Sequence, residues 1–359
     1  MRILLTVPSL AREYGGPVVK ATRLTEELRR LGHEVQLIGV GEREGAVGLP
    51  RLAGFHGTPI PSRWAPLGRA AREADVVHAI GYRDPVGSAA ILRARGLRVL
   101  EPVGMFGRIV RSERLKSVFD RTVGSQVVER ADLIVATSRQ EAAELVAGGI
   151  AEGKIRIRPN GVDPVGVDVG PHGAARRRFG IPRNAPLVLI LGRINRKKRL
   201  PDLVAALAGL PAAWCLIAGP DDRDGALQDV NDALRRFGMA DRVRVEPAGL
   251  WEEEKLQALS DADAFCLPSE HENFGNAPAE AAMVGLPVVL TDHCGVVEWL
   301  SRTSCEVVPV GDVVALAAAL QRALAPEQRQ AARRAVTELQ GRLSWPAVAA
   351  QQLAIYEAA

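Results

Sequence analysis

Residues 264–291 read AFCLPSEHENFGNAPAEAAMVGLPVVLT, and this stretch decides the fold. Ala264–Pro268 and Val288–Thr291 are short apolar runs, which are typical of strands covered on both faces of a sheet. Between them, Ala277–Val284 predicts a helix, and Gly275 lies in the loop before it. A strand, a helix and a second strand in this order predict a βαβ unit with parallel strands and a right-handed crossover.

The same alternation continues along the whole chain. In the first part we expect strands at Arg2–Val7, Glu34–Gly39, Asp75–Ala79, Arg98–Pro102, Asp132–Ala136 and Ile155–Arg158. In the second part we expect further strands at Leu187–Gly192, Trp214–Ala218, Arg242–Val245 and Ser304–Val308. Helices are expected between them, among others at Pro17–Leu31, Arg199–Leu207, Gly225–Phe237, Glu252–Ser260 and Val313–Leu324. Ser138 and Glu141 have capping-box spacing, which predicts another helix start.

Two series of strands and helices predict two Rossmann-like, doubly wound α/β domains. The glycine- and proline-rich stretch Asp163–Pro186 separates them, so we place the first domain at residues 1–165 and the second at 166–342. Residues 343–359 carry apolar side chains at helical spacing and predict a final amphipathic helix. Ligands of such sheets bind beyond the carboxyl ends of the strands, so we expect a cleft between the domains.

The composition excludes several classes of protein. Of 359 residues, 47% are hydrophobic and 25% charged, which argues against a disordered chain, a collagen and a coiled coil. No stretch approaches the roughly 18 consecutive apolar residues of a membrane-spanning helix, and the first apolar run is too short for a signal peptide. Cys215, Cys266, Cys294 and Cys305 form no CxxC pair, so we expect reduced thiols and a cytoplasmic protein.

Basic residues are concentrated in the first part of the chain. Residues 1–163 carry 25 basic and 18 acidic side chains, whereas residues 164–359 carry 21 and 24. The first domain is therefore expected to prefer an anionic partner, such as a membrane surface, a phosphorylated substrate or nucleic acid. The alternative is a GC-rich genome that encodes arginine where others encode lysine.

Two loops that follow predicted strands suggest binding of a phosphate group. Gly15 and Gly16 precede Pro17, and a glycine pair there lets backbone amides approach an anion at a helix N-terminus; the alternative is a simple turn. Arg193 and Lys198 straddle another loop and could both reach one pyrophosphate; the alternative is a solvated basic loop. The chain has neither a G-x-G-x-x-G after a strand nor a P-loop motif, which argues against a dinucleotide oxidoreductase and a P-loop NTPase.

The loop of residues 268–276 carries the sharpest signal. The backbone N–H groups of Phe274, Gly275 and Asn276 lie at the predicted helix N-terminus, where they can hold a diphosphate or sugar hydroxyls. Glu272 lies in the loop and Glu280 about one turn into the helix, and carboxylates bind pairs of hydroxyls. The alternative for Glu280 is ordinary stabilisation of the helix dipole, worth under ~1 kcal/mol.

These motifs, in this order, carry a resemblance that runs nearly from end to end. They are Gly15-Gly16, Asp75-Val-Val-His78, Asn160-Gly-Val-Asp163, Gly192-Arg193 with Lys198, Ala218-Gly-Pro220, Glu272-x7-Glu280, Gly295-Val-Val-Glu298 and Ser344-Trp345 with Tyr356. The chain resembles the retaining GT-B glycosyltransferases of the glycosyltransferase group 1 family. Its most specific part is the Glu-x7-Glu block, flanked by Pro-Ser and Gly-x-Pro-Val-Val.

The resemblance implies a GT-B fold and a nucleotide-sugar donor held mainly by the second domain. It assigns the donor diphosphate to Arg193 and Lys198, the donor sugar to Glu272, the ribose hydroxyls to Glu280, and further donor contacts to Phe274, Gly275, Asn276, Gly15 and Gly16. The acceptor is expected on the first domain, with His78 and Asn160 as candidate contacts. The last helix is expected to cross back to the first domain.

The resemblance also implies a mechanism. Arg193 and Lys198 would stabilise the charge on the leaving diphosphate, and the leaving phosphate would take the acceptor proton on the same face of the sugar. No metal and no cofactor are expected. Asp221-Asp222 is the one acidic pair that follows a strand like a metal motif, and solvation at the surface is its preferred interpretation.

The sequence departs from the family pattern at three positions. Val103 stands where relatives often carry histidine or arginine, so a catalytic histidine is not carried over. Cys294 and Arg199 each stand at a position where the family often has glycine. His78 is retained, with a purely structural role as the alternative.

We therefore expect a sugar transferase that builds a bacterial cell-surface polysaccharide or glycolipid; the donor base, the sugar and the acceptor stay open. Arg108–Lys116 with Arg121 predicts an amphipathic helix that could contact the inner face of an anionic membrane, and a solvated surface helix is the alternative. An inactive sugar-nucleotide-binding relative is a second reading, which the retention of Arg193, Lys198, Glu272 and Glu280 argues against. A nucleic-acid-binding protein is the least favoured, because only 4% of the residues are aromatic.

Overall fold

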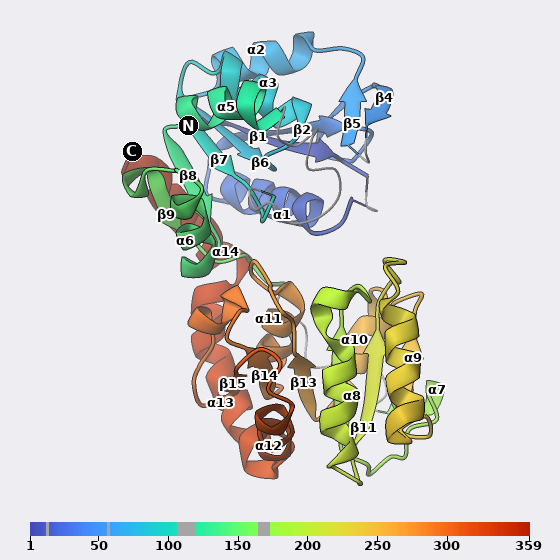
Figure 1. Ribbon diagram of the computed structural model, residues 1–359. Coiled ribbons are helices and arrows are strands. Elements are labelled where there is room, and N and C mark those ends of the chain that lie inside the picture. The colour runs from blue at the N-terminus through green and yellow to red at the C-terminus, as the bar shows by residue number, and fades with distance from the viewer. Residues whose placement is uncertain (12–13, 56–57, 106–118, 164–172) are drawn as a thin grey trace. The chain divides into compact units, whose positions relative to one another are not determined.

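The structure, a computed structural model, describes the chain except for residues 12–13, 56–57, 106–118 and 164–172. The described chain divides into two compact units (Figure 1). Unit 1 comprises Met1–Gly161 and Trp345–Ala359, and unit 2 comprises Val162–Ser344. Of the predicted boundaries, residue 165 lies outside the described residues and residue 342 lies inside a helix, α13 (Pro326–Leu343).

Unit 1 contains a parallel sheet with the strand order β3-β2-β1-β6-β7-β8-β9. The strands are β1 (Arg2–Ser9), β2 (Glu34–Val40), β3 (Val47–Leu49), β6 (Val76–Ile80), β7 (Leu97–Glu101), β8 (Leu133–Ala136) and β9 (Ile155–Ile157). The chain proceeds outward from β1 in one direction and then resumes at β6 on the other side. The switch point, where doubly wound sheets bind ligands, therefore lies between β1 and β6.

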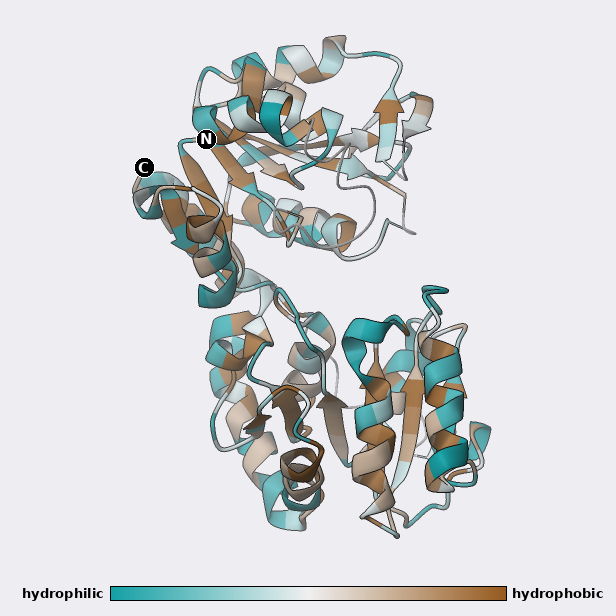
Figure 2. Cartoon of the chain, in the orientation of Figure 1, coloured by the Kyte–Doolittle hydropathy of each residue, from teal (hydrophilic) through white to brown (hydrophobic). Residues whose placement is uncertain are grey.

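Helices cover both faces of this sheet. They are α1 (Gly16–Arg30), α2 (Ala65–Glu73), α3 (Pro85–Arg93), α5 (Ser125–Arg130), α6 (Arg139–Ala147) and α14 (Trp345–Glu357), with the short turns η2 (Asp120–Gly124) and η3 (Glu152–Lys154). Successive residues of β1 point to opposite faces: Leu4 joins the core under α2 and α3, and Leu5 the core under α1 and α14. The last helix therefore completes the core of the first unit. The strands of both sheets are largely hydrophobic, and hydrophilic residues lie on the helices (Figure 2).

Unit 2 contains a second parallel sheet with the strand order β12-β11-β10-β13-β14-β15. Its strands are β10 (Leu187–Leu191), β11 (Trp214–Ala218), β12 (Val243–Glu246), β13 (Ala264–Leu267), β14 (Val288–Thr291) and β15 (Cys305–Val308). Its helices are α7 (Ala174–Arg178), α8 (Leu200–Ala208), α9 (Ala226–Phe237), α10 (Glu253–Asp261), α11 (Asn276–Met283), α12 (Val313–Ala323) and α13, with the turns η4 (Arg196–Lys198) and η5 (Gly295–Trp299). Here the switch point lies between β10 and β13.

The predicted strands of both sheets are confirmed, with ends that differ by one or two residues. Sequence analysis did not name the short strand β3, the antiparallel hairpin of β4 (Arg51–Phe55) and β5 (Thr58–Pro61), or the helices α2, α3, α5, α7 and α13. The four cysteines are free thiols, as expected. Among the described helices, none is long and apolar enough to cross a membrane.

Candidate active site

The loop after β10 places two predicted cations at the carboxyl edge of the second sheet. Its first residue, Gly192, has φ 145°, and it packs so closely on Gly219 that a Cβ at Gly219 would overlap the Gly192 carbonyl oxygen. Arg193 projects from this loop with 70% of its side chain exposed, and its Nη1 lies 3.0 Å from Oδ2 of Asp222. Asp222 also accepts a hydrogen bond of 2.9 Å from Nδ2 of Asn195. Asp222 is partly exposed, as a solvated surface residue would be, but it also pairs with Arg193 and Asn195.

The loop after β13 is fixed to the segment that follows β14. The backbone N–H of Glu272 donates to the His293 carbonyl at 2.9 Å, and the Gly295 N–H donates to the Glu272 carbonyl at 3.0 Å. The carbonyl of Phe274, whose side chain is buried, accepts from the Val296 N–H at 2.7 Å. These bonds hold the backbone of residues 272–274 in one position before helix α11 begins.

Lys198 and Glu272 meet across the switch point of unit 2. Nζ of Lys198 lies 2.5 Å from Oε1 of Glu272, and Ser269 Oγ donates to the same oxygen at 2.9 Å. The two loops are also joined by their backbones, because the Glu270 N–H donates to the Lys197 carbonyl at 2.7 Å. Two residues that lie 74 positions apart thus form one charged pair. The pair is mostly covered, and both side chains retain some exposed surface.

Gly275 and Cys294 shape the entrance to helix α11. Gly275 has φ 99° and is the N-cap residue, so no side chain caps the first turn of the helix. A Cβ at Gly275 would lie 2.9 Å from Sγ of Cys294, which shows that the sulfur fills the space beside the glycine. Burial raises the pKa of the Cys294 thiol, so this cysteine is a neutral packing group. Asn276 is the first helical residue, one position before the predicted helix start at Ala277.

Glu280 lies on α11 and is paired with a lysine that sequence analysis missed. Nζ of Lys255, on α10, is 3.0 Å from both carboxylate oxygens of Glu280. Burial raises the pKa of Glu280, Lys255 opposes this shift, and the nearby charge of Asp163 adds to it. Lys255 ends a run of glutamates, and no motif or spacing in the sequence distinguishes it.

The glycine pair of the first unit forms the turn that was expected. Gly15 has φ 82° and is the N-cap residue of α1, Gly16 is the first helical residue, and Pro17 follows in the first turn. This turn lies after β1, at the switch point of the unit 1 sheet. Beside it, burial and then the charge of Asp84 raise the pKa of Tyr14 to about 12. The role of Gly15 and Gly16 in donor binding stays a prediction.

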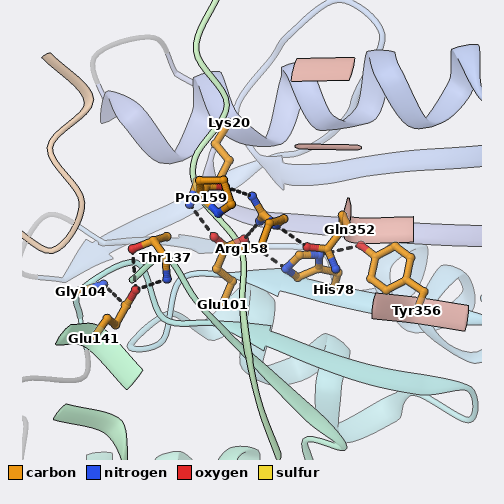
Figure 3. A network of polar contacts seen from close by, with 10 residues as sticks. All are labelled: Lys20, His78, Glu101, Gly104, Thr137, Glu141, Arg158, Pro159, Gln352 and Tyr356. Atoms are coloured by element: carbon orange, nitrogen blue, oxygen red, sulfur yellow. Dashed lines mark hydrogen bonds and ion pairs between the residues drawn. The ribbon is translucent and has the colours of Figure 1, made fainter. Parts of the chain in front are cut away.

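His78 lies at the centre of a buried polar network in unit 1 (Figure 3). Its Nδ1 is 2.7 Å from the hydroxyl of Tyr356, and its Nε2 is 3.3 Å from Oε2 of Glu101. Glu101 also receives Nζ of Lys20 at 2.6 Å and Nη2 of Arg158 at 2.7 Å. The His78 side chain is fully buried, and this position favours the structural alternative over contact with an acceptor.

The charges of this network determine its protonation. Burial by itself would raise the pKa of Glu101, but Arg158, Lys20 and His78 hold it well below its ordinary value. Burial lowers the pKa of His78, and the positive charges of Arg158 and Lys20 add to the effect against the pull of Glu101. His78 is therefore neutral, and we assign its proton to Nε2, which faces the carboxylate, so that Nδ1 accepts from Tyr356.

The other candidate positions of unit 1 are held by tight packing. Asn160 is buried, and at the next residue a Cβ on Gly161 would overlap the indole ring of Trp345. Val103 has φ 50°, which is rare for a β-branched residue, and Gly104 after it donates its N–H to Oε1 of Glu141 at 3.0 Å.

The capping box predicted at Ser138 and Glu141 is confirmed. Ser138 Oγ accepts from the Glu141 N–H at 3.1 Å, while Oε2 of Glu141 accepts from the backbone and the hydroxyl of Thr137, both at 2.7 Å (Figure 3). The predicted amphipathic helix at Arg108–Lys116 lies outside the described residues. In the part of the chain that the structure describes, no group of three or more His, Cys, Asp or Glu side chains is placed to hold a metal ion.

Known sequences and structures resemble both units. Residues 173–338 match the family model "Glycosyl transferases group 1", and residues 15–161 match the model "Glycosyl transferase 4-like domain". A D-inositol 3-phosphate glycosyltransferase of Xylanimonas cellulosilytica is 33% identical over 252 residues, which cover 66% of this chain and 59% of that protein. The same enzyme of Mycolicibacterium smegmatis is 35% identical over 47% of this chain and 40% of its own length. The chain thus spans about two fifths to three fifths of these curated relatives.

Solved structures share the fold over the entire chain. HepE of Anabaena, solved with UDP and glucose, superposes with a TM-score of 0.78 over 100% of both chains at 18% identity. Two adjoining glycosyltransferase models cover most of the sequence, and the parallel sheets of both units agree with the GT-B architecture. The chain is therefore a member of the group 1 glycosyl transferases, in which a glycosyl transferase 4-like domain precedes a glycosyl transferases group 1 domain.

Proposed function

We propose that this protein transfers a sugar from a nucleotide diphosphate sugar to an acceptor hydroxyl with retention of the anomeric configuration. The observation that carries the proposal is the meeting of Lys198 and Glu272 across the switch point of a group 1 domain. Lys198, which would bind the diphosphate, and Glu272, which would bind the sugar hydroxyls, lie 2.5 Å apart, and this proximity supports the proposal.

We assign the surrounding residues to different parts of the donor. Arg193 and Lys198 would bind the diphosphate, because both are cations on one loop and Arg193 is exposed. Glu272 would bind hydroxyls of the donor sugar, and Glu280 the ribose. The backbone amides at Phe274–Asn276 would complete the site, since the first turn of α11 has no side-chain cap.

The chemistry follows from where charge develops. The bond between the anomeric carbon and the phosphate oxygen breaks, so that negative charge grows on the diphosphate and positive charge on the sugar ring. Lys198 and Arg193 stabilise the negative charge in place. The acceptor oxygen bonds to the anomeric carbon on the face that the phosphate leaves, and its proton passes to the departing phosphate oxygen. This route uses no protein nucleophile and no metal ion.

The comparisons suggest which substrates to try first. HepE was solved with UDP and glucose, and the sequence relatives are named for transfer to D-inositol 3-phosphate. We therefore propose a UDP-sugar as the first donor to test. The acceptor would be a sugar or a lipid-linked sugar bound by unit 1, in the synthesis of a bacterial cell-surface polysaccharide or glycolipid. Action in the cytoplasm, with peripheral membrane contact, belongs to the same proposal.

A donor panel tests the proposal. The purified protein is titrated with UDP-, GDP- and ADP-sugars, and binding and release of the nucleoside diphosphate are measured with and without EDTA. We expect one donor to bind and to turn over in the presence of EDTA. Absence of binding to every donor would refute the proposal, and binding without turnover on any acceptor would favour the inactive sugar-nucleotide-binding relative. A product with inverted configuration would refute the retaining mechanism alone.

A further inference from the structure

Lys255 contacts a carboxylate of the proposed donor site, although no family motif includes it. We propose that Lys255 is a positioning residue, which fixes the Glu280 carboxylate so that its remaining lone pairs face the two ribose hydroxyls of the donor. The inference rests on the proposed function, because it assumes that Glu280 binds the ribose. Lys255 would then contribute to the discrimination between ribonucleotides and deoxyribonucleotides.

The geometry of the pair is unusual for a surface ion pair. Nζ of Lys255 is 3.0 Å from Oε1 and 3.0 Å from Oε2 of Glu280, so one ammonium group chelates both oxygens. The two side chains come from different helices, α10 and α11, which are consecutive in the chain but follow different strands of the sheet. A chelated carboxylate cannot rotate freely about its terminal bond. The plane of the Glu280 carboxylate is therefore fixed before any ligand binds.

The hydrogen-bonding capacity of Glu280 fits a vicinal diol. An ionised carboxylate accepts about four hydrogen bonds, and Lys255 uses one position on each oxygen. One position on each oxygen remains, which matches the 2′- and 3′-hydroxyl groups of a ribose. Lys255 itself has a third N–H that does not point at Glu280. The pair is about one quarter to one third exposed, so a ligand can approach it.

Lys255 opposes the influences that raise the pKa of Glu280. The charged groups that act on Glu280 are Lys255, which lowers its pKa, and Asp163, which raises it together with burial. Other elements also pack against α11, namely η5 with Glu298 and α13 with Arg329 and Arg333. Arg329 is committed to Asp263 at 2.5 Å, and Arg333 lies against Gly285, beyond the C-terminal end of α11. Lys255 is thus the cation whose charge counters the rise in the pKa of Glu280.

Removal of Lys255 should therefore have two linked effects. Glu280 would lose its fixed orientation, and its pKa would rise further, so that the carboxyl would begin to take up a proton at a higher pH. A protonated carboxyl has fewer acceptor positions for the ribose. Nucleotide affinity of the variant should then fall as the pH is lowered, earlier than in the unaltered protein.

The test compares nucleoside diphosphates with and without ribose hydroxyls. UDP, GDP and ADP, each with its 2′,3′-dideoxy analogue, are titrated against the full chain by calorimetry between about pH 8 and pH 5.5. We expect Lys255→Met to weaken the best nucleotide about tenfold near pH 7.5 and more at lower pH, while its dideoxy analogue changes less than about twofold. Lys255→Arg should keep most of the affinity, because it keeps the charge.

Two further variants separate the possible outcomes. In a Glu280→Gln background, Lys255→Met should have no further effect, because the two residues act through one contact. Gln257→Met, on the same helix, is paired with Glu253 and not with Glu280 and should leave affinity unchanged at every pH. If Lys255→Met binds the nucleotide equally well or more tightly, or weakens both analogues equally, the inference is wrong. If the unaltered protein binds none of the three nucleotides, the proposed function fails as well.

Discussion

The two units use the same kinds of side chain in opposite ways. In unit 1, Glu101, Arg158 and His78 are 0% exposed, and Arg158 and His78 both lie beside the Glu101 carboxylate. In unit 2, the side chains of Lys198 and Glu272 are 14% and 19% exposed, and that of Arg193 is 70% exposed. This difference indicates which charged groups are able to bind a ligand. A charged network sealed from water holds elements together, whereas an ion pair at a sheet edge that solvent can reach can exchange its partner for a ligand.

The free energy needed to remove a charge from water explains this difference between the two units. A charge that has been removed from water must keep its partner, because the loss of one member leaves the other uncompensated in a medium of low polarity. A partly exposed pair contributes little to stability, since water replaces a lost partner. Each prediction below tests one side of this contrast.

The largest expected effect is on the stability of unit 1. Glu101→Gln keeps the shape of the side chain but removes the negative charge between Lys20 and Arg158. We expect a loss of about 3–5 kcal/mol in the free energy of unfolding, measured by denaturant titration at neutral pH. The folded-state pKa of Glu101 lies below its unfolded value, so its contribution is present above the unfolded pKa and declines as the pH falls through the folded one. The variant should lack this part of the acid sensitivity.

An exposed ion pair of the same sheet provides the matched control. Arg98 and Asp132 lie 3.0 Å apart between β7 and β8, and both are partly exposed. Arg98→Met should cost no more than about 1 kcal/mol. Equal losses in Glu101→Gln and Arg98→Met would break the contrast between sealed and exposed charges.

The next effect is on catalysis and not on folding. Lys198→Ala removes the cation that would meet the leaving diphosphate, and we expect a loss of about 2–4 kcal/mol in transition-state stabilisation, measured as kcat with the donor that the panel identifies. The melting temperature should fall less than in Glu101→Gln, because both side chains of the pair with Glu272 retain some exposed surface. Lys154→Ala, which removes a lysine of unit 1 bonded to the backbone carbonyls of Glu129 and Ala131, serves as the control. Near-normal turnover of Lys198→Ala would remove this residue from the proposed mechanism.

The smallest effect concerns the attachment of the last helix. Tyr356→Phe removes the hydroxyl that donates to Nδ1 of His78, and we expect a loss of about 1–2 kcal/mol in unfolding free energy. Because burial lowers the folded-state pKa of His78, the unfolded chain binds the extra proton, and stability of the unaltered protein should fall as the pH drops below about 6.5. Hydrogen exchange should show faster opening of α14, with the protection of α10 to α13 unchanged. Equal acceleration in both units would contradict a local role.

The sheets could be predicted because their strands are continuous apolar runs. The elements that sequence analysis missed lack that signal. Leu52 in β4 is 70% exposed, and the buried residues of β5 are Pro59 and Pro61, so the hairpin carries no alternating pattern of typical strand residues. Helix α13 buries Ala332, Ala335, Leu339 and Leu343, and alanines give only a weak apolar stripe.

The motifs of the proposed donor site could be found because each is a short run of residues, whereas the partners of these residues lie far along the chain. Lys198, Glu272 and Glu280 carry recognisable spacing. Asp222, which orients Arg193, lies 29 residues away from it, and Lys255 lies 25 residues from Glu280. Such pairings arise from the order of strands in the sheet and not from local sequence. The partner of His78 is more distant still, 278 residues along the chain.

Unit 1 is discontinuous in the chain, and this has a consequence for its synthesis. Residues 162–344, which make up unit 2, leave the ribosome before Gln352 and Tyr356 do. Until then, Nε of Arg158 lacks its Gln352 partner and Nδ1 of His78 lacks its donor. Unit 2 can therefore finish folding before the last helix has been synthesised and can complete unit 1. A nascent chain stalled just before residue 345 should contain a protease-resistant second unit and a first unit that remains open to cleavage.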